Sequence, residues 1–306
     1  MRFSLLLIAG ATAATAGCRG SGAERGGPAL RGPLVVFNAG SLAYPFRQLL
    51  EAFAREHPGV VPSQESSGSL EAARKLTDLG KIPDLLAVAD YGVITRLLIP
   101  SHATGYTGFA SNSMVLAYSD RSAFAGEITG ANWWRILLRP EVRWANSNPA
   151  LDPNGYRALM VFQLAELHYG EPGLARRLER DLEPRFVRPS EAQLIGLVQA
   201  GELDYAWSYR SLAVTAGLRW VALPAEIDLS DPARTDQYLA ARVRLPGPSL
   251  GGRDSVEFRG EPIRYALTIP TGAPHPELAR EFVRFVLSQR GTEILEQAGL
   301  VVRRER

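Results

Sequence analysis

The chain has 306 residues, which is long enough for one large domain or for two of ordinary size. Hydrophobic residues make up 46% and charged residues 22% of the chain, and this balance excludes disordered and fibrous classes of protein. The formal net charge is +2, and the sequence has no basic stripe of the kind that binds nucleic acid. A single cysteine excludes a disulfide framework or a thiolate metal cluster.

The N-terminus has the pattern of an exported lipoprotein. Residues 1–17 carry one early cation, an apolar run over residues 3–8 and then small residues, which predicts a signal peptide too short to span a membrane. The unique Cys18 follows the small residues, as in acylated bacterial lipoproteins; the alternative is an ordinary signal peptide with an incidental cysteine. Residues 18–32 are rich in glycine and predict a flexible tether. We therefore expect export to the periplasm or cell surface, with a lipid anchor.

Strand and helix patterns alternate directly after the tether. The apolar run at 34–37 is typical of a buried parallel strand, and residues 42–53 carry apolar side chains at helical spacing. A second extended segment begins at residue 60, a second amphipathic helix spans 70–79, and 84–88 is a third apolar strand. This strand–helix–strand–helix–strand order predicts a parallel α/β sheet.

The same alternation continues to the end of the chain. The patterns predict, in order, a strand at 114–118, helices at 133–138, 155–169 and 191–200, and a strand at 204–209. A loop-rich stretch from about 224 to 260 is followed by a strand at 263–269, a strongly amphipathic helix at 276–288 and a closing segment at 291–298. Two α/β lobes account for this length.

Two junctions between a strand and a helix share one chemistry. Gly40-Ser41 and Ser67-Gly68-Ser69 each place hydroxyls and backbone N–H groups at a predicted helix N-terminus, where the helix dipole favours an anion. Serine is also the ordinary N-cap of a helix, so each junction alone has a structural explanation. Two such junctions at consecutive strand ends point into one crevice, where open α/β sheets bind ligands. The residues alone leave both uses open.

The second half of the chain adds two acids and a tyrosine at similar places. Asp152 precedes a predicted helix, Glu191 begins another, and Tyr209 ends a predicted strand. Asp152 also suits a helix cap, Glu191 suits a partner of the helix dipole, and Tyr209 suits a half-buried strand aromatic. A ligand role and a structural role therefore remain open for each.

Taken in order, these motifs resemble the molybdate/tungstate-binding proteins of ABC importers, in their tungstate-type branch. The resemblance rests on VVFNAGSL at 35–42, SSGSLEAARKLTDLGKIPDLLAVADY at 66–91, DPNGYRALMVFQLAEL at 152–167, RPSE at 188–191 and LDYAWSYRS at 203–211. It implies an α/β fold of the two-lobed periplasmic binding protein type (type II), each lobe a mainly parallel sheet flanked by helices, with the ligand in the interlobe cleft. Lobe I would comprise 33–110 and 255–306, and lobe II 111–254.

The resemblance also implies a set of ligand-binding residues. Carried over position by position, the residues that would contact the oxyanion are Gly40, Ser41, Ser69, Asp152, Pro153, Asn154, Glu191 and Tyr209. In the tungstate-type branch, carboxylates at the positions of Asp152 and Glu191 ligate the metal atom itself. Asn154 departs from the family, because many members carry cysteine there. The implied partners are an ABC permease and its ATPase, and the implied protein is a monomer without a resident cofactor.

The paired acids help to discriminate between ligands. Ionised Asp152 and Glu191 would repel sulfate or phosphate, whose central atoms offer no coordination site. Molybdenum(VI) and tungsten(VI) are hard, oxygen-preferring centres that can add two carboxylate oxygens. A bare cation such as ferric ion would also accept the acids, but it has no use for serine donors at helix N-termini.

Other classes of function have weaker support in the sequence. The four histidines are scattered, and no nucleophile elbow, zinc-binding helix motif or P-loop occurs, so we expect no enzyme; a serine hydrolase would need a base beside Ser41 or Ser69. A receptor for a sugar or another organic solute remains an alternative, with Trp133, Trp134, Trp144 and Trp207 as the candidate aromatic platform.

Overall fold

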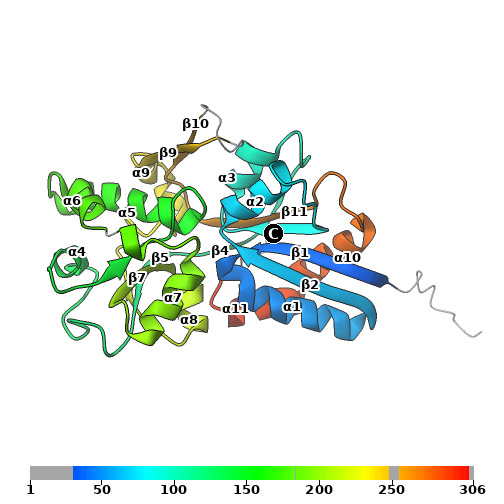
Figure 1. Cartoon of the computed structure of the whole chain (residues 1–306), viewed down its shortest axis with the longest axis horizontal. Coiled ribbons are helices and arrows are strands. Elements are labelled where there is room, and N and C mark those ends of the chain that lie inside the picture. Colours follow the sequence, from blue (N-terminus) through cyan, green and yellow to red (C-terminus); the bar gives the residue numbers. More distant parts are fainter. Residues whose placement is uncertain (1–29, 183, 248–254, 303–306) are drawn as a thin grey trace, which may run out of the picture.

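The computed structural model describes residues 30–182, 184–247 and 255–302, and Figure 1 shows them as two lobes side by side. The expected signal peptide, the expected lipid on Cys18 and most of the expected tether lie outside the described residues and stay predictions. No helix within the described ranges is both long enough and apolar enough to cross a membrane.

The first sheet has five strands in the order β2-β1-β3-β11-β4. Their bounds are Arg31–Ala39 for β1, Gly59–Ser67 for β2, Leu85–Val88 for β3, Thr107–Ser111 for β4 and Arg264–Thr268 for β11. Strand β1 pairs in parallel with β2 and β3, as the apolar runs predicted, and β11 lies antiparallel between β3 and β4. The chain therefore returns near its end to complete the sheet with which it began.

Helices cover both faces of this sheet. They are α1 (Ala43–Glu56), α2 (Ser69–Thr77), α3 (Tyr91–Val93), α10 (Pro276–Leu287) and α11 (Gln289–Gln297), with the short helical segments η1 (Gly40–Leu42) and η2 (Ile94–Leu98). Phe53 of α1 packs edge-on against Phe282 of α10 at 5.3 Å between ring centroids. Phe46 contacts the same ring at 6.2 Å. Burial of these phenylalanines, each worth roughly 1.5–3 kcal/mol, fixes the C-terminal helix to the first lobe.

The second sheet has four strands in the order β6-β7-β5-β8. The strands are β5 (Met114–Tyr118), β6 (Trp144–Ala145), β7 (Tyr205–Tyr209) and β8 (Arg219–Ala222). Strand β6 is parallel to β7, whereas β5 is antiparallel to both β7 and β8. The expectation of a mainly parallel sheet is therefore wrong for this lobe, where two of these three strand pairings are antiparallel. The helices of this lobe are α4 (Trp133–Leu137), α5 (Pro153–Tyr169), α6 (Leu174–Asp181), α7 (Glu191–Ala200) and α8 (Arg210–Thr215), with the short helix η3 (Pro184–Phe186).

The stretch expected to be loop-rich contains regular structure. It holds η4 (Pro232–Arg234), α9 (Thr235–Tyr238), β9 (Arg242–Pro246) and β10 (Ser255–Arg259), and the two strands form an antiparallel hairpin of their own. Both strands are largely exposed, so their apolar pattern is weak. Phe258 anchors β10 by stacking on Tyr156 of α5 at 4.8 Å. The lobe boundaries given above stay a prediction.

Candidate functional site

The end of β1 carries the first junction to the edge of the other lobe. β1 runs directly into η1, so Gly40 and Ser41 stand at the carboxyl end of a central strand. A Cβ on Gly40 would lie 3.4 Å from the Cβ of Ala192 and 3.7 Å from that of Ser190, at the start of α7. The first junction and the N-terminus of α7 are therefore in close contact, and a methyl group at position 40 would lie at ordinary van der Waals distance from α7.

A tyrosine links Ser41 to the second lobe. The Ser41 Oγ lies 3.0 Å from the hydroxyl of Tyr265, which also accepts a hydrogen bond of 3.2 Å from the amide of Asn112. The ring of Tyr265 packs edge-on against that of Tyr209 at 5.8 Å. Sequence reasoning did not select Tyr265 or Asn112. A tyrosine within a strand, such as Tyr265 in β11, and an asparagine between two strands, such as Asn112 between β4 and β5, follow no distinctive spacing.

The second junction meets a backbone carbonyl of the other lobe. A Cβ on Gly68 would lie only 2.2 Å from the carbonyl oxygen of Leu151, so glycine is required for this approach. The same oxygen accepts hydrogen bonds from the N–H groups of Leu70 (3.0 Å) and Glu71 (3.2 Å) at the start of α2. We expected the N-terminal donors of this helix to be free for an anion, and for these two donors that expectation is wrong.

Ser69 keeps one donor that is directed away from its own helix. Its Oγ is buried and accepts a hydrogen bond of 3.0 Å from the N–H of Ala89, just after β3. Because that lone pair is used by a backbone donor, the proton of the hydroxyl remains available to a further acceptor. Ser69 is therefore suited to donate to a bound anion.

The two acids of the second lobe are brought together at the starts of two helices. Asp152 caps α5, with its Oδ1 accepting from the N–H of Asn154 at 3.2 Å, and its Oδ2 accepts from the N–H of Glu191 at 2.7 Å. The Oε1 of Glu191 accepts in turn from the N–H of Tyr209 and from the hydroxyl of Ser208, both at 3.2 Å. One hydrogen-bonded chain thus connects the three second-lobe candidates.

Both carboxyl groups are almost fully buried, with exposed fractions of 5% for Asp152 and 1% for Glu191. Burial raises the pKa of Asp152 to about 6, against the opposing hydrogen bonds from Glu191 and Asn154. Burial and then the charge of Asp152 raise the pKa of Glu191 well above its ordinary value. Two buried acids that repel each other form a site in which a positive centre would be stabilised.

A buried arginine accompanies the acids and was missed at the level of sequence. Arg157 of α5 donates to the carbonyl of Ala89 and to the hydroxyl of Tyr209, each at 2.8 Å, and pairs with Asp90 at 3.1 Å. Its charge lowers the pKa of both site carboxyls, although less than burial raises them. Its position within a helix gives no sequence signal, because its partners in the first lobe lie far away in the chain.

Asn154 contributes a buried donor without a partner. Its Oδ1 accepts from the hydroxyl of Ser147 at 3.2 Å, while its Nδ2 has no hydrogen-bond partner among the described residues. An unpaired buried donor costs roughly 1–3 kcal/mol, and a bound oxyanion would remove that cost. Pro153, at the first position of α5, fixes the turn that holds Asp152 and Asn154 side by side.

A hollow of about 540 Å³ opens between the lobes beside these residues. Its first-lobe wall includes Ser67 and Lys75, and its second-lobe wall includes Leu151 and Ser190. Lys75 is neutralised there by Glu65 at 2.7 Å. The hollow therefore marks the mouth of the interlobe cleft without adding a free cation to it.

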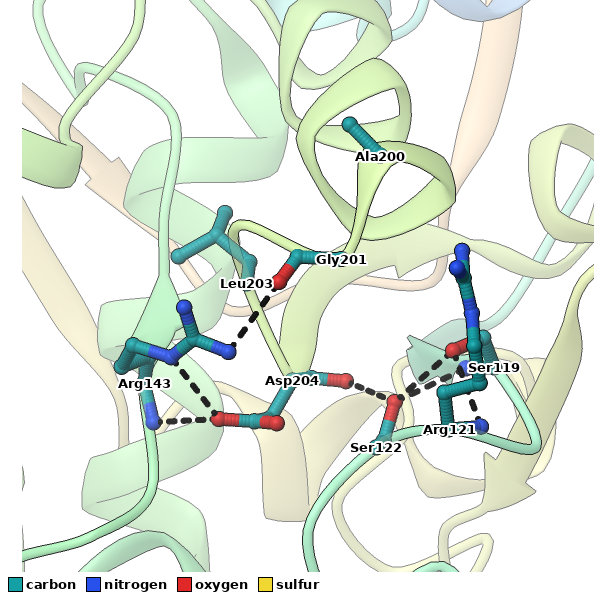
Figure 2. Close-up of a pocket in the computed structure, with 8 residues that line it drawn as sticks. All are labelled: Ser119, Arg121, Ser122, Arg143, Ala200, Gly201, Leu203 and Asp204. Atoms are coloured by element: carbon teal, nitrogen blue, oxygen red, sulfur yellow. Dashed lines mark hydrogen bonds and ion pairs between the residues drawn. The ribbon is translucent and has the colours of Figure 1, made fainter.

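A second hollow, of about 200 Å³, lies at the opposite end of α7 and is shown in Figure 2. Arg143 donates to the carbonyl of Gly201 at 3.1 Å, and Arg121 donates to that of Gln199 at 2.7 Å, so both arginines satisfy the last carbonyls of the helix. Asp204 accepts from the N–H of Arg143 at 2.9 Å. Because these groups are already paired within the protein, this hollow is not a candidate site.

Within the described ranges, no group of three or more histidine, cysteine, aspartate or glutamate side chains is placed to hold a metal ion. Asp152 and Glu191 therefore form a pair without a third protein ligand of these types. A pair of oxygen ligands suits a metal atom that brings its own oxygens better than it suits a bare cation, which needs more ligands from the protein.

Residues 34–301 match the family model for bacterial extracellular solute-binding proteins. The chain is 42% identical over 270 residues to an uncharacterized solute-binding protein of Petrotoga mobilis, with 88% of this chain and 84% of the relative covered. It is 36% identical over 307 residues to the molybdate/tungstate-binding protein WtpA of Pyrococcus abyssi, with 92% and 87% covered.

The solved periplasmic molybdate-binding protein of Azotobacter vinelandii has the same fold, with a TM-score of 0.62, 18% identity and coverage of 89% of this chain and 100% of that one. This likeness confirms the expected two-lobed α/β fold. At 18% identity it carries no statement about the ligand.

Proposed function

The chain belongs to the family of bacterial extracellular solute-binding proteins, and from that premise we propose that it captures molybdate or tungstate for import by an ABC transporter. The relatives that carry this ligand in their names are similar over nearly the whole chain. The residues of the interlobe site supply the chemical reason for this choice of ligand.

The observation that carries the proposal is the buried pair Asp152 and Glu191 beside hydroxyl donors of the other lobe. A tetrahedral anion without coordination sites, such as sulfate, would meet repulsion from the two acids. Molybdate and tungstate carry a metal centre that can bind one oxygen of each acid. The acids therefore select against sulfate and favour a metal oxyanion.

The oxygens of the anion need donors, and the site supplies them from both lobes. Ser41 and Ser69 offer hydroxyls from the first lobe, while Tyr209 and the unpaired Nδ2 of Asn154 offer protons from the second. The hydroxyl protons of the two serines and the amide protons of Asn154 have no function toward ferric ion, which argues against the cation receptor on the same scaffold. We propose Gly40, through its backbone, as a further contact.

The mechanism is binding with closure of the lobes. The close approach of Gly40 to Ser190 and the hydrogen bonds from α2 to Leu151 join the two lobes in the arrangement that the structure shows. A ligand that touches both lobes stabilises this arrangement by its differential affinity for it. The ligand would reach an ABC permease and its ATPase from there, with the monomer held near the membrane by the lipid on Cys18.

The other organic-solute and enzymatic functions are less well supported. Trp133, Trp134, Trp144 and Trp207 are all buried, and Trp133 packs on Trp207 at 5.2 Å, so these rings serve the core. Ser41 and Ser69 have hydrogen-bond partners other than histidine within the described residues, so neither has the general base of a hydrolase.

Native mass spectrometry and calorimetry of the purified full chain test the proposal. We expect a tightly held oxyanion of molybdenum or tungsten at one per chain, and no measurable heat with sulfate or ferric citrate at the same concentrations. Binding of sulfate as tight as that of tungstate would contradict the role of the acids, and absence of any binding of tungstate and molybdate would contradict the function.

A further inference from the structure

Arg157 lies deeply buried where the second lobe meets the first. It extends from α5 of the second lobe, has an exposed fraction of 3%, and ends against the segment that follows β3 in the first lobe. Its Nη1 donates to the Ala89 carbonyl and the Tyr209 hydroxyl, and its Nη2 faces Asp90. Both protons of Nη1 are therefore used by the protein, and this nitrogen has none left for a ligand.

The contact with Tyr209 decides which way that hydroxyl points. A guanidinium can only donate, so the oxygen of Tyr209 must accept from Arg157 and its own proton must be directed elsewhere. Tyr209 is thereby fixed as a donor next to the two acids.

Ala89 links Ser69 to Arg157 through its two backbone polar groups, which belong to successive peptide groups. The N–H of Ala89 donates to the Oγ of Ser69, while the residue's carbonyl accepts from Arg157. Because Arg157 comes from the second lobe and Ala89 from the first, the hydrogen bond between them joins the lobes. The bonds that orient Tyr209 and Ser69 each lie within one lobe, so Arg157 both orients Tyr209 and ties the second lobe to Ala89.

We propose that Arg157 is a positioning residue for the oxyanion: without touching the ligand, it makes the Tyr209 hydroxyl an obligatory donor. The proposal rests on the proposed function, since it concerns the same site. Asp90 holds the guanidinium in place and accepts a hydrogen bond from the hydroxyl of Tyr156, so its charge is compensated on the side away from Tyr209.

A double-mutant cycle on tungstate affinity tests this role. The variants are Tyr209→Phe, Arg157→Lys and the double variant, measured by calorimetry on the full chain. A lysine at position 157 keeps a positive charge opposite Asp90. Its single ammonium group cannot reproduce the planar guanidinium that donates to both the Ala89 carbonyl and the Tyr209 hydroxyl. We expect each single variant to lose about tenfold in affinity, and Arg157→Lys to lose less than about threefold when Tyr209 is already phenylalanine.

Arg74→Lys is the matched control. Arg74 is also a buried arginine that bridges the lobes, through a hydrogen bond of 2.7 Å to the Ala150 carbonyl, but it contacts no hydroxyl of the site. Its effect on affinity should be the same with Tyr209 or with phenylalanine at that position. If Arg157→Lys does not fold, as judged by its thermal transition, Arg157→Met takes its place in the cycle, because methionine is also unbranched but has no donor for Tyr209.

The outcomes separate the two proposals. If the wild type binds tungstate and the affinity losses of Arg157→Lys and Tyr209→Phe multiply fully in the double variant, the proposed function stands and the positioning role is overturned. A wild-type chain that binds neither tungstate nor molybdate would overturn both. We expect the double variant to lose much less affinity than the product of the two single losses. The cycle with Arg74→Lys should show no such difference.

Discussion

The two lobes supply the site with opposite kinds of chemistry. The first lobe contributes neutral hydroxyls, Ser41 and Ser69, whose lone pairs are already satisfied by neutral neighbours within the protein. The second lobe contributes Asp152 and Glu191, two buried acids whose pKa values are raised above their ordinary range. The serine hydroxyls of the first lobe therefore cost no free energy in the absence of a ligand. The two buried acids of the second lobe lower the stability of the ligand-free chain, and a bound positive centre would remove that cost.

This difference assigns separate tasks to the two halves. Neutral donors recognise any oxyanion of suitable size, because they interact with its outer oxygens alone. Buried acids discriminate, because they penalise every anion that cannot coordinate them. The same reasoning predicts that changes on the acid side affect selectivity as well as stability and affinity, and that changes on the donor side affect affinity without changing selectivity.

The largest expected effect concerns stability without ligand. The pKa of Asp152 is about 6 in the folded chain against 3.8 as its ordinary value, so the folded state binds the proton more tightly than the unfolded state. The free energy of unfolding should therefore fall as the pH rises from about 4 to about 6, by about 3 kcal/mol for this group. Thermal unfolding of the ligand-free chain across this pH range measures the effect.

Glu191→Gln sharpens that experiment. Glutamine can keep the acceptor for Ser208 and the N–H of Tyr209 while it replaces the buried carboxyl group whose ionisation the charge of Asp152 opposes. The variant should unfold several degrees higher than the wild type at pH 7 without ligand and show a weaker dependence on pH. A variant less stable than the wild type at pH 7 would contradict the idea that the acids store unfavourable energy.

The next effect concerns affinity on the acid side. Glu191→Ala removes one proposed ligand of the metal atom and should weaken tungstate binding at least about a hundredfold, since loss of mere outer partners of a metal already costs 10–100-fold. Tyr209→Phe, which removes one donor, should cost about tenfold. Calorimetry on both variants checks the order, and equal losses would break the contrast between the acids and the donors.

The smallest effect is expected on the donor side. Ser41→Ala should lower tungstate affinity about tenfold, because one hydrogen bond to a charged ligand is lost, and should lower the stability of the ligand-free chain by only about 1 kcal/mol through loss of the bond to Tyr265. Ser63→Ala, at an exposed serine of β2, is the matched control and should change neither quantity. Loss of selectivity against sulfate in Ser41→Ala would show that discrimination does not belong to the acids alone.

The sequence predicted the buried part of the fold better than its margins. Strands β1 and β3 lie in a sheet covered on both faces, so they stand out as continuous apolar runs. Strand β8 was missed because most of its residues are exposed, and β9 and β10 were missed for the same reason. Exposed strands form because they pair with neighbouring strands in the sheet. The side chains of such a strand need no apolar pattern, so the sequence gives little indication of the pairing.

The candidate site divides in the same way. Residues next to helix starts, such as Ser69 and Glu191, could be selected because a strand end followed by a helix start is visible in the sequence. Arg157 and Tyr265 could not, because their partners come from distant segments and depend on closure of the lobes. The occupation of the α2 donors by the Leu151 carbonyl is likewise a tertiary contact without a local pattern.

The most direct test is X-ray absorption at the tungsten edge of the chain loaded with one equivalent of tungstate. We expect six oxygen neighbours around tungsten, four from the anion and two at longer distance from Asp152 and Glu191, and five in the Glu191→Ala variant. Four equivalent oxygens in the wild type, indistinguishable from free tungstate, would contradict direct ligation by the two acids.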